Sequence, residues 1–247
     1  MARGEEVAEL VDTRVFILAG GLGTRLAHIT KNLPKPMARV AGRPFLEWQI
    51  EGFKDQGFLD FVFLVGHKRE AIQDHFLDGS RFGVRVQYSI EDELLGTGGA
   101  FLKALGDFPC RTFVLANGDT YFNVSLKSLL GEVGRHSDRV YIALKHLDEM
   151  SRYGAVVVSA EWKIEAFLEK NPMTGSSYIN GGVYAGRPSQ FARFDIGRSS
   201  METDVFPKLI RQEALFGFPF EVPFIDIGVP EDFTKAQALL PLWNTQK

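Results

Sequence analysis

A glycine-rich segment near the start of the chain has the composition of a phosphate-binding loop. In order, the segment reads Leu18, Ala19, Gly20, Gly21, Leu22, Gly23, Thr24, Arg25 and Leu26. Glycines let backbone N–H groups close around phosphate oxygens, because no Cβ intervenes. The loop lacks the Gly-Lys-Ser/Thr ending of a Walker A motif and the third, helix-opening glycine of the dinucleotide fingerprint. By itself it is also compatible with a glycine-rich turn flanked by solvated charges.

Two cationic side chains accompany this loop. Arg25 follows the glycines at once, and Lys35 comes later in the chain, between Pro34 and Pro36. A nucleoside triphosphate under attack needs cations at the α-phosphate and at the departing pyrophosphate, because negative charge grows there. A fork-shaped guanidinium and a point-like ammonium on a stiff backbone suit that task. Arg25 and Lys35 are therefore candidate catalytic residues.

Acidic side chains stand where two strands are expected to end. Asn117-Gly118-Asp119 follows an apolar run, and Asp226 lies within the short apolar stretch Phe224–Gly228. Ligands collect at the carboxyl ends of strands in open α/β sheets, and Mg²⁺ prefers carboxylate and phosphate oxygens. Asp119 is therefore a candidate Mg²⁺ ligand. Taken singly, either aspartate is also an ordinary turn or capping residue.

A third segment combines acidic residues with a glycine turn. Glu91-Asp92-Glu93 precedes Gly96–Gly99, which leads into an expected helix. The N–H groups at the start of such a helix favour an acceptor or an anion. A solvated glutamate in an acidic loop is the alternative interpretation of Glu91.

Composition excludes several classes of protein. The 247 residues are 45% hydrophobic and 24% charged, with a net charge of −3, which is ordinary globular usage and gives no general nucleic-acid or membrane surface. No apolar run approaches the roughly 20 residues of a membrane span. Met1–Asp12 has no apolar core and is not a secretory signal. The one cysteine, Cys110, excludes an internal disulfide, is expected to be an inert buried thiol, and fits a cytoplasmic location.

The first half of the chain alternates apolar runs with amphipathic stretches. The expected strands are Arg14–Ala19, Phe61–Val65, Val84–Ser89 and Thr112–Ala116. The expected helices are Pro44–Gly57, Lys68–Leu77 and one starting with Gly98–Leu105. Strands separated by helices predict βαβ crossovers and a mainly parallel sheet covered on both faces.

The second half has a different rhythm, with strands that follow one another closely. The expected strands are Val140–Leu144, Ala155–Val158, Ile164–Glu169, Tyr178–Tyr184 and Phe224–Gly228. Helices are expected at Ser199–Ala214 and Pro230–Leu240. The pattern predicts an α/β fold with a mixed, mainly parallel sheet flanked by helices, and a small β-rich extension.

The stretch from Leu18 to Pro36 resembles the signature of the sugar-1-phosphate nucleotidyltransferase family, and the match continues in order from about Val15 to Leu240. The resemblance implies a Rossmann-like nucleotide-diphospho-sugar transferase fold. It also implies an Mg²⁺-dependent reaction that joins a nucleoside triphosphate to a sugar 1-phosphate and releases pyrophosphate. The expected organisation is an N-terminal extension, residues 1–12, and one catalytic domain, residues 13–243. Its nucleotide-binding half spans about 13–125 and its sugar-phosphate-binding half about 126–243.

The resemblance also assigns roles to individual residues. The residues implied for the nucleotide are Leu18, Ala19, Gly20, Gly21, Gly23, Thr24, Glu91, Gly96, Thr97, Asn117 and Gly118. Those implied for the sugar phosphate are Tyr153, Gly154, Glu169, Lys170, Asn180 and Gly181. Lys170 would orient the sugar phosphate for attack, and Asp226 would share the metal with Asp119. Read from the residues alone, Glu169-Lys170 is a surface ion pair and Asn180-Gly181 a tight turn.

Glu91 bears on the choice of base, since the matching position in the family reads the Watson–Crick edge. A carboxylate only accepts hydrogen bonds. Guanine presents N1–H and its N2 amino group side by side, whereas cytosine presents one amino donor and uracil places N3–H between two acceptors. Glu91 therefore favours GTP, leaves cytosine open and disfavours uracil.

Within the family, the resemblance is strongest to guanylyltransferases that act on D-glycero-α-D-manno-heptose 1-phosphate and supply GDP-heptose for surface glycans. The segments that carry it are Tyr88–Glu93, Leu95–Ala100, Ser151–Gly154, Ile179–Tyr184 and Phe224–Asp232. Mannose-1-phosphate guanylyltransferase is the alternative, because the two sugars share a ring and differ at the exocyclic carbon.

A non-catalytic, nucleotide-sugar-binding regulatory subunit is an alternative of a different class. Such a subunit would be expected to lack Arg25, Lys35, Asp119 or Asp226, and all four are present. We expect GTP and a sugar 1-phosphate as partners, no nucleic acid or membrane, and a monomer or homodimer.

Overall fold

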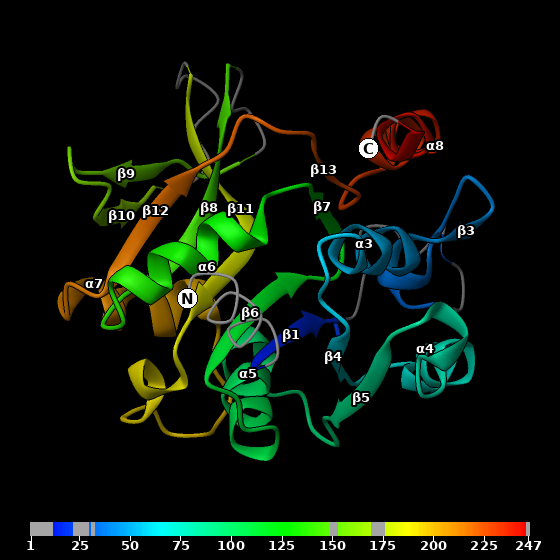
Figure 1. The fold of residues 1–247 in the computed structure, drawn as a ribbon, viewed down its shortest axis with the longest axis horizontal. Helices are drawn as coiled ribbons and strands as arrows, with labels where there is room; N and C mark the ends of the chain where they lie inside the picture. The colour runs from blue at the N-terminus through cyan, green and yellow to red at the C-terminus, as the bar shows by residue number, and fades with distance from the viewer. Residues whose placement is uncertain (1–11, 22–29, 31–32, 149–152, 169–175, 246–247) are drawn as a thin grey trace, which may run out of the picture.

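A computed structural model describes residues 12–21, 30, 33–148, 153–168 and 176–245 of the chain (Figure 1). Its centre is a seven-stranded sheet in the order β12-β8-β11-β6-β1-β4-β5. The strands of this sheet are β1 (Thr13–Leu18), β4 (Asp60–Val65), β5 (Arg85–Ile90), β6 (Thr112–Asn117), β8 (Val140–Leu147), β11 (Ser177–Gly186) and β12 (Leu215–Pro219). The helices in the described part are α3 (Phe45–Lys54), α4 (Arg69–Phe76), α5 (Gly96–Asp107), α6 (Leu126–Arg135), α7 (Phe206–Arg211) and α8 (Pro230–Thr245).

The nucleotide-binding half predicted from sequence contains four neighbouring parallel strands of the sheet. β1 pairs in parallel with β4 on one side and β6 on the other, and β4 pairs in parallel with β5. The carboxyl ends of these four strands therefore lie along one edge. The register aligns Leu18 with both Leu64 and Asn117, so the loops that follow β1, β4 and β6 start side by side.

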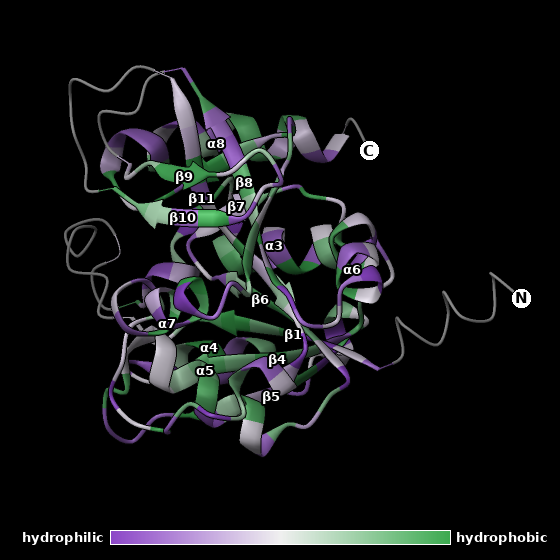
Figure 2. Ribbon diagram, turned by 90° about the vertical axis from the view of Figure 1, so that its left-hand side faces the viewer, coloured by the Kyte–Doolittle hydropathy of each residue, from purple (hydrophilic) through white to green (hydrophobic). Residues whose placement is uncertain are grey.

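The sheet is buried on both faces, and the alternation of side chains along β1 shows why. Val15 and Ile17 belong to a core cluster under α3, α4 and α6. Phe16, between them, faces the opposite cluster, which includes α5 and α7. Strands buried on both faces are continuously apolar, and Figure 2 shows hydrophobic residues gathered on the central strands. The many phenylalanines thus serve mainly as core, as expected from the sequence.

The other half adds antiparallel pairing to the same sheet. β11 runs antiparallel to both β6 and β8, and the edge strand β12 is parallel to β8. A two-stranded extension of β9 (Val156–Val158) and β10 (Ile164–Phe167) is bridged to the sheet at Ala155–Ile179 and Lys163–Phe216. The predicted mixed, mainly parallel α/β sheet with a small β-rich extension is therefore confirmed.

A third apolar cluster attaches the C-terminal helix. β13 (Phe224–Asp226) pairs antiparallel with β7 (Thr120–Phe122), and α8 packs beside them and against β2 (Arg39–Val40). β3 (Arg43–Pro44) completes a short hairpin with β2. Figure 1 shows α8 and β13 beside β7 and α3. This pairing brings Asp226, late in the sequence, next to the segment that follows β6.

Two sequence-based expectations about elements need correction. The predicted helix Ser199–Ala214 is instead a π-helical turn, η5 (Met201–Val205), followed by the short α7. Pro207 lies in the first turn of α7, because proline has no N–H to donate within a helix. The prediction also omitted α6, β7 and β12, and β12 begins at Leu215, directly after the residue where the helix was expected to end.

Two smaller expectations can also be compared with the structure. Burial raises the pKa of the Cys110 thiol to about 11, which disfavours the reactive thiolate. Across the described residues, no helix has the length and apolar character that crossing a membrane would require.

Candidate active site

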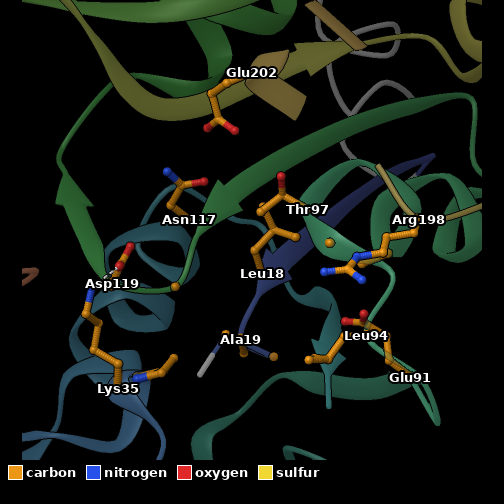
Figure 3. Close-up of a pocket in the computed structure, with 16 residues that line it drawn as sticks. Leu18, Ala19, Lys35, Glu91, Leu94, Thr97, Asn117, Asp119, Arg198 and Glu202 are labelled. Carbon is orange, nitrogen blue, oxygen red and sulfur yellow. Dashed lines mark hydrogen bonds and ion pairs between the residues drawn. The ribbon is translucent and has the colours of Figure 1, made fainter. Parts of the chain in front are cut away.

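A cavity of about 550 Å³ lies at the edge where the parallel strands end (Figure 3). This position is the usual ligand site of an open α/β sheet. The residues that line it are Leu18, Ala19, Gly20, Gly21, Lys35, Pro36, Glu91, Leu94, Gly96, Thr97, Ala100, Asn117, Gly118, Asp119, Arg198 and Glu202. All of the predicted nucleotide residues that the structure describes therefore share one cavity with Lys35 and Asp119.

Close backbone contacts form the floor of this cavity. A Cβ on Gly20 would lie 2.9 Å from Glu91 Oε1 and 3.0 Å from the amide nitrogen of Gly66. A Cβ on Gly118 would lie 2.5 Å from the carbonyl oxygen of Leu18. A side chain at position 118 would clash with the backbone, and one at position 20 would displace the Glu91 carboxylate, because the loops after β1, β4, β5 and β6 approach one another closely.

One end of the cavity holds an ion pair. Lys35 Nζ donates to Asp119 Oδ2 at 2.5 Å, and the side chains are 13% and 31% exposed. Lys35 begins the 3₁₀ turn η2 (Lys35–Met37), and the extended Pro34 before it restricts the backbone. Both partners are thus held at the cavity wall.

The second predicted metal ligand lies beside this pair. Ile227 N donates to the Asp119 carbonyl at 3.0 Å, and Gly228 N donates to Asp226 Oδ1 at 2.6 Å. A Cβ on Gly228 would lie 3.4 Å from Lys35 Nζ. The pairing of β13 with β7 therefore brings Asp226 close to Asp119 and Lys35.

The donor set here fits a hard divalent cation. Asp119 and Asp226 supply carboxylate oxygens, and the ammonium of Lys35 shows that positive charge is accommodated beside them. Within the described ranges, no group of three or more His, Cys, Asp or Glu side chains could hold a metal. An ion bound between two carboxylates would need further oxygens from phosphate or water, as Mg²⁺ commonly does.

The opposite end of the cavity carries Glu91, which directly follows β5. Its Oε2 accepts a hydrogen bond from the Leu95 amide at 3.0 Å. Burial raises the pKa of the Glu91 carboxyl, partly offset by this bond. Each carboxylate oxygen can accept more than one hydrogen bond, so Glu91 still has acceptor capacity for donors on a ligand. The apolar, half-exposed Leu94 lies beside it at the mouth.

The N–H groups at the start of α5 have an acceptor, as the sequence led us to expect. The Gly98 and Gly99 amides both donate to the Ser199 carbonyl, at 2.9 and 3.2 Å. The acceptor expected at this helix start is therefore part of the chain itself. These two amides are not available to an anion, and the cavity wall here includes Gly96 and Thr97, the two residues before them.

A buried tyrosine on β11 holds Asn180 in position. The side-chain amide nitrogen of Asn180 donates to the Tyr184 hydroxyl at 3.0 Å. The Tyr184 phenol is fully buried, and burial raises its pKa, so it stays protonated. The side-chain oxygen Oδ1 of Asn180 also accepts from the Gly182 amide at 2.9 Å. Asn180 is thus fixed in orientation, and Gly182 beside it packs closely against the Asn117 side chain, which lines the cavity.

The predicted sugar-phosphate residues that the structure describes lie outside the lining of the cavity. They are Tyr153, Gly154, Asn180 and Gly181. A Cβ on Gly154 would lie 2.5 Å from the Leu168 carbonyl, and one on Gly181 would lie 2.4 Å from the Phe122 ring. Close packing is therefore sufficient to explain both glycines.

Several predicted residues lie outside the described part of the chain, and several cavity residues were not predicted. The former are Gly23, Thr24, Arg25, Glu169 and Lys170. The latter are Pro36, Leu94, Ala100, Arg198 and Glu202. Pro36, Leu94 and Ala100 lie inside motifs already noted. Arg198 and Glu202 belong to no motif, and only the fold brings them to the cavity.

Comparisons with known proteins agree with this geometry. Residues 14–241 match the nucleotidyl transferase family. The D-glycero-α-D-manno-heptose 1-phosphate guanylyltransferase of Aneurinibacillus thermoaerophilus is 38% identical over 224 residues, which cover 90% of this chain and 96% of that protein. A protein of the same description from Campylobacter jejuni is 36% identical over 220 residues, 89% of this chain and 96% of that one.

A solved structure extends the comparison to the fold. HddC from Yersinia pseudotuberculosis, complexed with GMP-PN, is similar with a TM-score of 0.81 and 32% identity. The match covers 91% of this chain and 97% of HddC. The chain is a nucleotidyltransferase and belongs to the nucleotidyl transferase family.

Proposed function

We propose that the protein transfers GMP from GTP to D-glycero-α-D-manno-heptose 1-phosphate and thereby forms GDP-heptose, for surface glycans, and pyrophosphate. The observation that carries this proposal is the polarity of the cavity. A hydrogen-bond acceptor, Glu91, stands at one end, and Lys35 with Asp119 stands at the other. The relatives named for heptose 1-phosphate cover nearly the whole chain and support this choice of sugar.

The same polarity orients the nucleotide. Its base would lie at Glu91, where the carboxylate accepts from guanine N1–H and N2, and its phosphates would lie at Lys35. The glycine floor at Gly20 and Gly21 would let backbone N–H groups approach the phosphates. Gly23, Thr24 and Arg25 would complete this loop. The guanidinium of Arg25 would compensate negative charge on the triphosphate.

The reaction requires no covalent enzyme intermediate. An oxygen of the sugar 1-phosphate, already anionic, attacks the α-phosphorus of GTP and forms the new P–O bond. The bond from that phosphorus to the oxygen bridging the α- and β-phosphates breaks, and pyrophosphate leaves with the electron pair. The protein contributes positioning and charge compensation rather than a general base. Lys35 is placed to compensate charge on the phosphates.

We assign Mg²⁺ to Asp119 and Asp226. When bound, the ion would neutralise charge on the α-phosphate and the leaving group. We assign the sugar phosphate to the β11 side of the cavity, where Tyr184 fixes the amide of Asn180. Asn180 and Glu169 would bind sugar hydroxyls, Tyr153, Gly154 and Gly181 would border the sugar, and Lys170 would hold its phosphate.

Pyrophosphate release tests the proposal directly. The purified protein is mixed with Mg²⁺, each of the common nucleoside triphosphates, and a panel of sugar 1-phosphates that includes heptose and mannose. We expect the highest kcat/KM for GTP with D-glycero-α-D-manno-heptose 1-phosphate. Preference for mannose 1-phosphate would refute the choice of sugar, and preference for another triphosphate would refute the choice of base. No release with any pair, despite nucleotide-sugar binding, would indicate a regulatory subunit.

A further inference from the structure

Residues 197–201, here called the clasp, attach the second half of the chain to the wall of the nucleotide cavity. The Ser199 amide donates to the Leu95 carbonyl at 2.8 Å, and the Met201 amide donates to Thr97 Oγ1 at 2.9 Å. These bonds add to those that the Ser199 carbonyl accepts from the start of α5. The clasp is therefore fixed to the same turn, Leu94–Thr97, that borders the predicted base site.

Glycines make this attachment possible. Gly96 has a φ of +71°, and a Cβ there would lie 2.5 Å from the Ser199 carbonyl oxygen. A Cβ on Gly99 would lie 2.1 Å from the Gly197 carbonyl oxygen. Side chains at either position would separate the two segments. The residues on either side of Arg198 are Gly197 and Ser199, and both contact the start of α5 directly. The backbone at Arg198 is therefore held in place.

Arg198 presents an unused guanidinium to the cavity. Its side chain lines the cavity, and Figure 3 shows it extending toward the end that holds Leu94 and Glu91, away from Lys35 and Asp119. No hydrogen bond or ion pair connects Arg198 to any residue that the structure describes. Its five N–H donors are therefore available to a ligand at the base end.

The chemistry of guanine supplies a matching acceptor. If Glu91 accepts from N1–H and N2, the neighbouring O6 carbonyl is left without a donor. An unpaired carbonyl in a binding site is costly, and arginine is the side chain that most often donates to guanine O6. Adenine carries an amino group at this position, which cannot accept from a guanidinium.

We propose that Arg198 is a specificity-determining residue that donates a hydrogen bond to guanine O6, on the opposite side of the base edge from the groups bound by Glu91. The inference rests on the proposed function, because it takes GTP to be the nucleotide. Two side chains far apart in sequence would then recognise a complementary set of donor and acceptor groups, and the clasp would hold one of them in position.

The test is a thermodynamic cycle that combines one substitution in the protein with the replacement of one atom in the nucleotide. Arg198→Met keeps the apolar stem and removes every donor, and 6-thio-GTP keeps N1–H and N2 but replaces O6 with sulfur, a weak acceptor. Binding constants for GTP and 6-thio-GTP are measured by competition against a fluorescent GTP analogue. We expect Arg198→Met to weaken the binding of GTP about tenfold and to change the affinity for 6-thio-GTP about threefold or less.

A matched control and a milder variant accompany this cycle. Arg193→Met removes the same charge from an exposed site outside the cavity lining, and we expect it to leave both affinities unchanged. Arg198→Lys keeps one charged donor and should recover part of the preference for GTP over 6-thio-GTP. This recovery also tests the inference if Arg198→Met folds poorly.

Two results would overturn the inference. Equal weakening of GTP and 6-thio-GTP by Arg198→Met would assign Arg198 to the phosphates or to cavity shape, and unchanged GTP binding would make it a solvated surface arginine. The wild-type protein separates these results from failure of the proposed function. If it does not bind GTP, the choice of nucleotide fails; if it binds GTP but the cycle shows no coupling, only the role of Arg198 fails.

Discussion

The contact between the clasp and α5 predicts opposite effects for two alanine substitutions in one helix. Gly99→Ala places a Cβ 2.1 Å from the Gly197 carbonyl oxygen, a separation that real Cβ atoms essentially never show. Gly106→Ala, later in α5, meets no atom closer than the Ile196 side chain at 4.0 Å. Both substitutions gain about 1 kcal/mol of helix propensity. Their difference therefore measures the clasp contact.

The size of this difference in unfolding free energy follows from the hydrogen bonds that Gly99→Ala would break. To relieve the clash, the clasp must withdraw, which breaks the bonds that join Ser199 to Leu95, Gly98 and Gly99. Each is worth about 0.5–1.5 kcal/mol net, so the total is about 2–4 kcal/mol. After the gain in propensity, we expect Gly99→Ala to lose about 1–3 kcal/mol of unfolding free energy. Gly106→Ala should gain up to about 1 kcal/mol.

Urea unfolding followed by circular dichroism measures both free energies, and thermal melts check them. At this chain length, each kcal/mol changes Tm by roughly 2–4 °C. Because Arg198 lies on the clasp, Gly99→Ala should also weaken GTP binding, whereas Gly106→Ala should not. The reasoning is refuted if the two variants are equally stable, or if Gly99→Ala binds GTP as tightly as the wild type.

Three further predictions concern the β11 side of the proposed active site and the two ends of the cavity. Tyr184→Phe keeps the buried ring but removes the hydroxyl that holds Asn180, so KM for the sugar 1-phosphate should rise about three- to tenfold; an unchanged KM would contradict this role. Glu91→Gln should weaken GTP binding about tenfold or more, because its amide opposes the guanine donors. Burial raises the pKa of Glu91, so wild-type affinity should fall as acidification protonates the carboxylate, and a pH titration should show no such step in Glu91→Gln. Asp119→Ala should lower turnover roughly a hundredfold and change the Mg²⁺ dependence in steady-state titrations; an unchanged dependence would contradict the metal assignment.

Local patterns in the sequence were sufficient for the fold class and for most of the cavity floor. The apolar run ending at Leu18 and the glycines after it predict a strand followed by a phosphate loop, because both signals lie within a few residues. The same holds for Glu91 and for Asn117–Asp119, which directly follow strands β5 and β6. Since parallel strands end at one edge of a sheet, recognising each strand end also predicts that these residues meet.

The sequence pattern was less reliable where packing determines the element. Ser199–Ala214 has helical spacing of apolar residues, yet the structure has a π-helical turn, then the short α7, which ends at Arg211, and β12 from Leu215. The clasp bonds to α5 on one side and the pairing of β12 with β8 on the other set these boundaries. Such long-range contacts leave no periodic signal in the segment itself.

By itself, the sequence determined the reaction class, because the chemistry depends on residue types close together in the chain, such as Gly20 and Lys35. It did not determine which distant side chains complete the cavity. Arg198 belongs to no motif, and it reaches the base end because the Ser199 carbonyl of the clasp accepts hydrogen bonds from the Gly98 and Gly99 amides at the start of α5. That placement depends on contacts between segments about a hundred residues apart, so only the tertiary structure decided it.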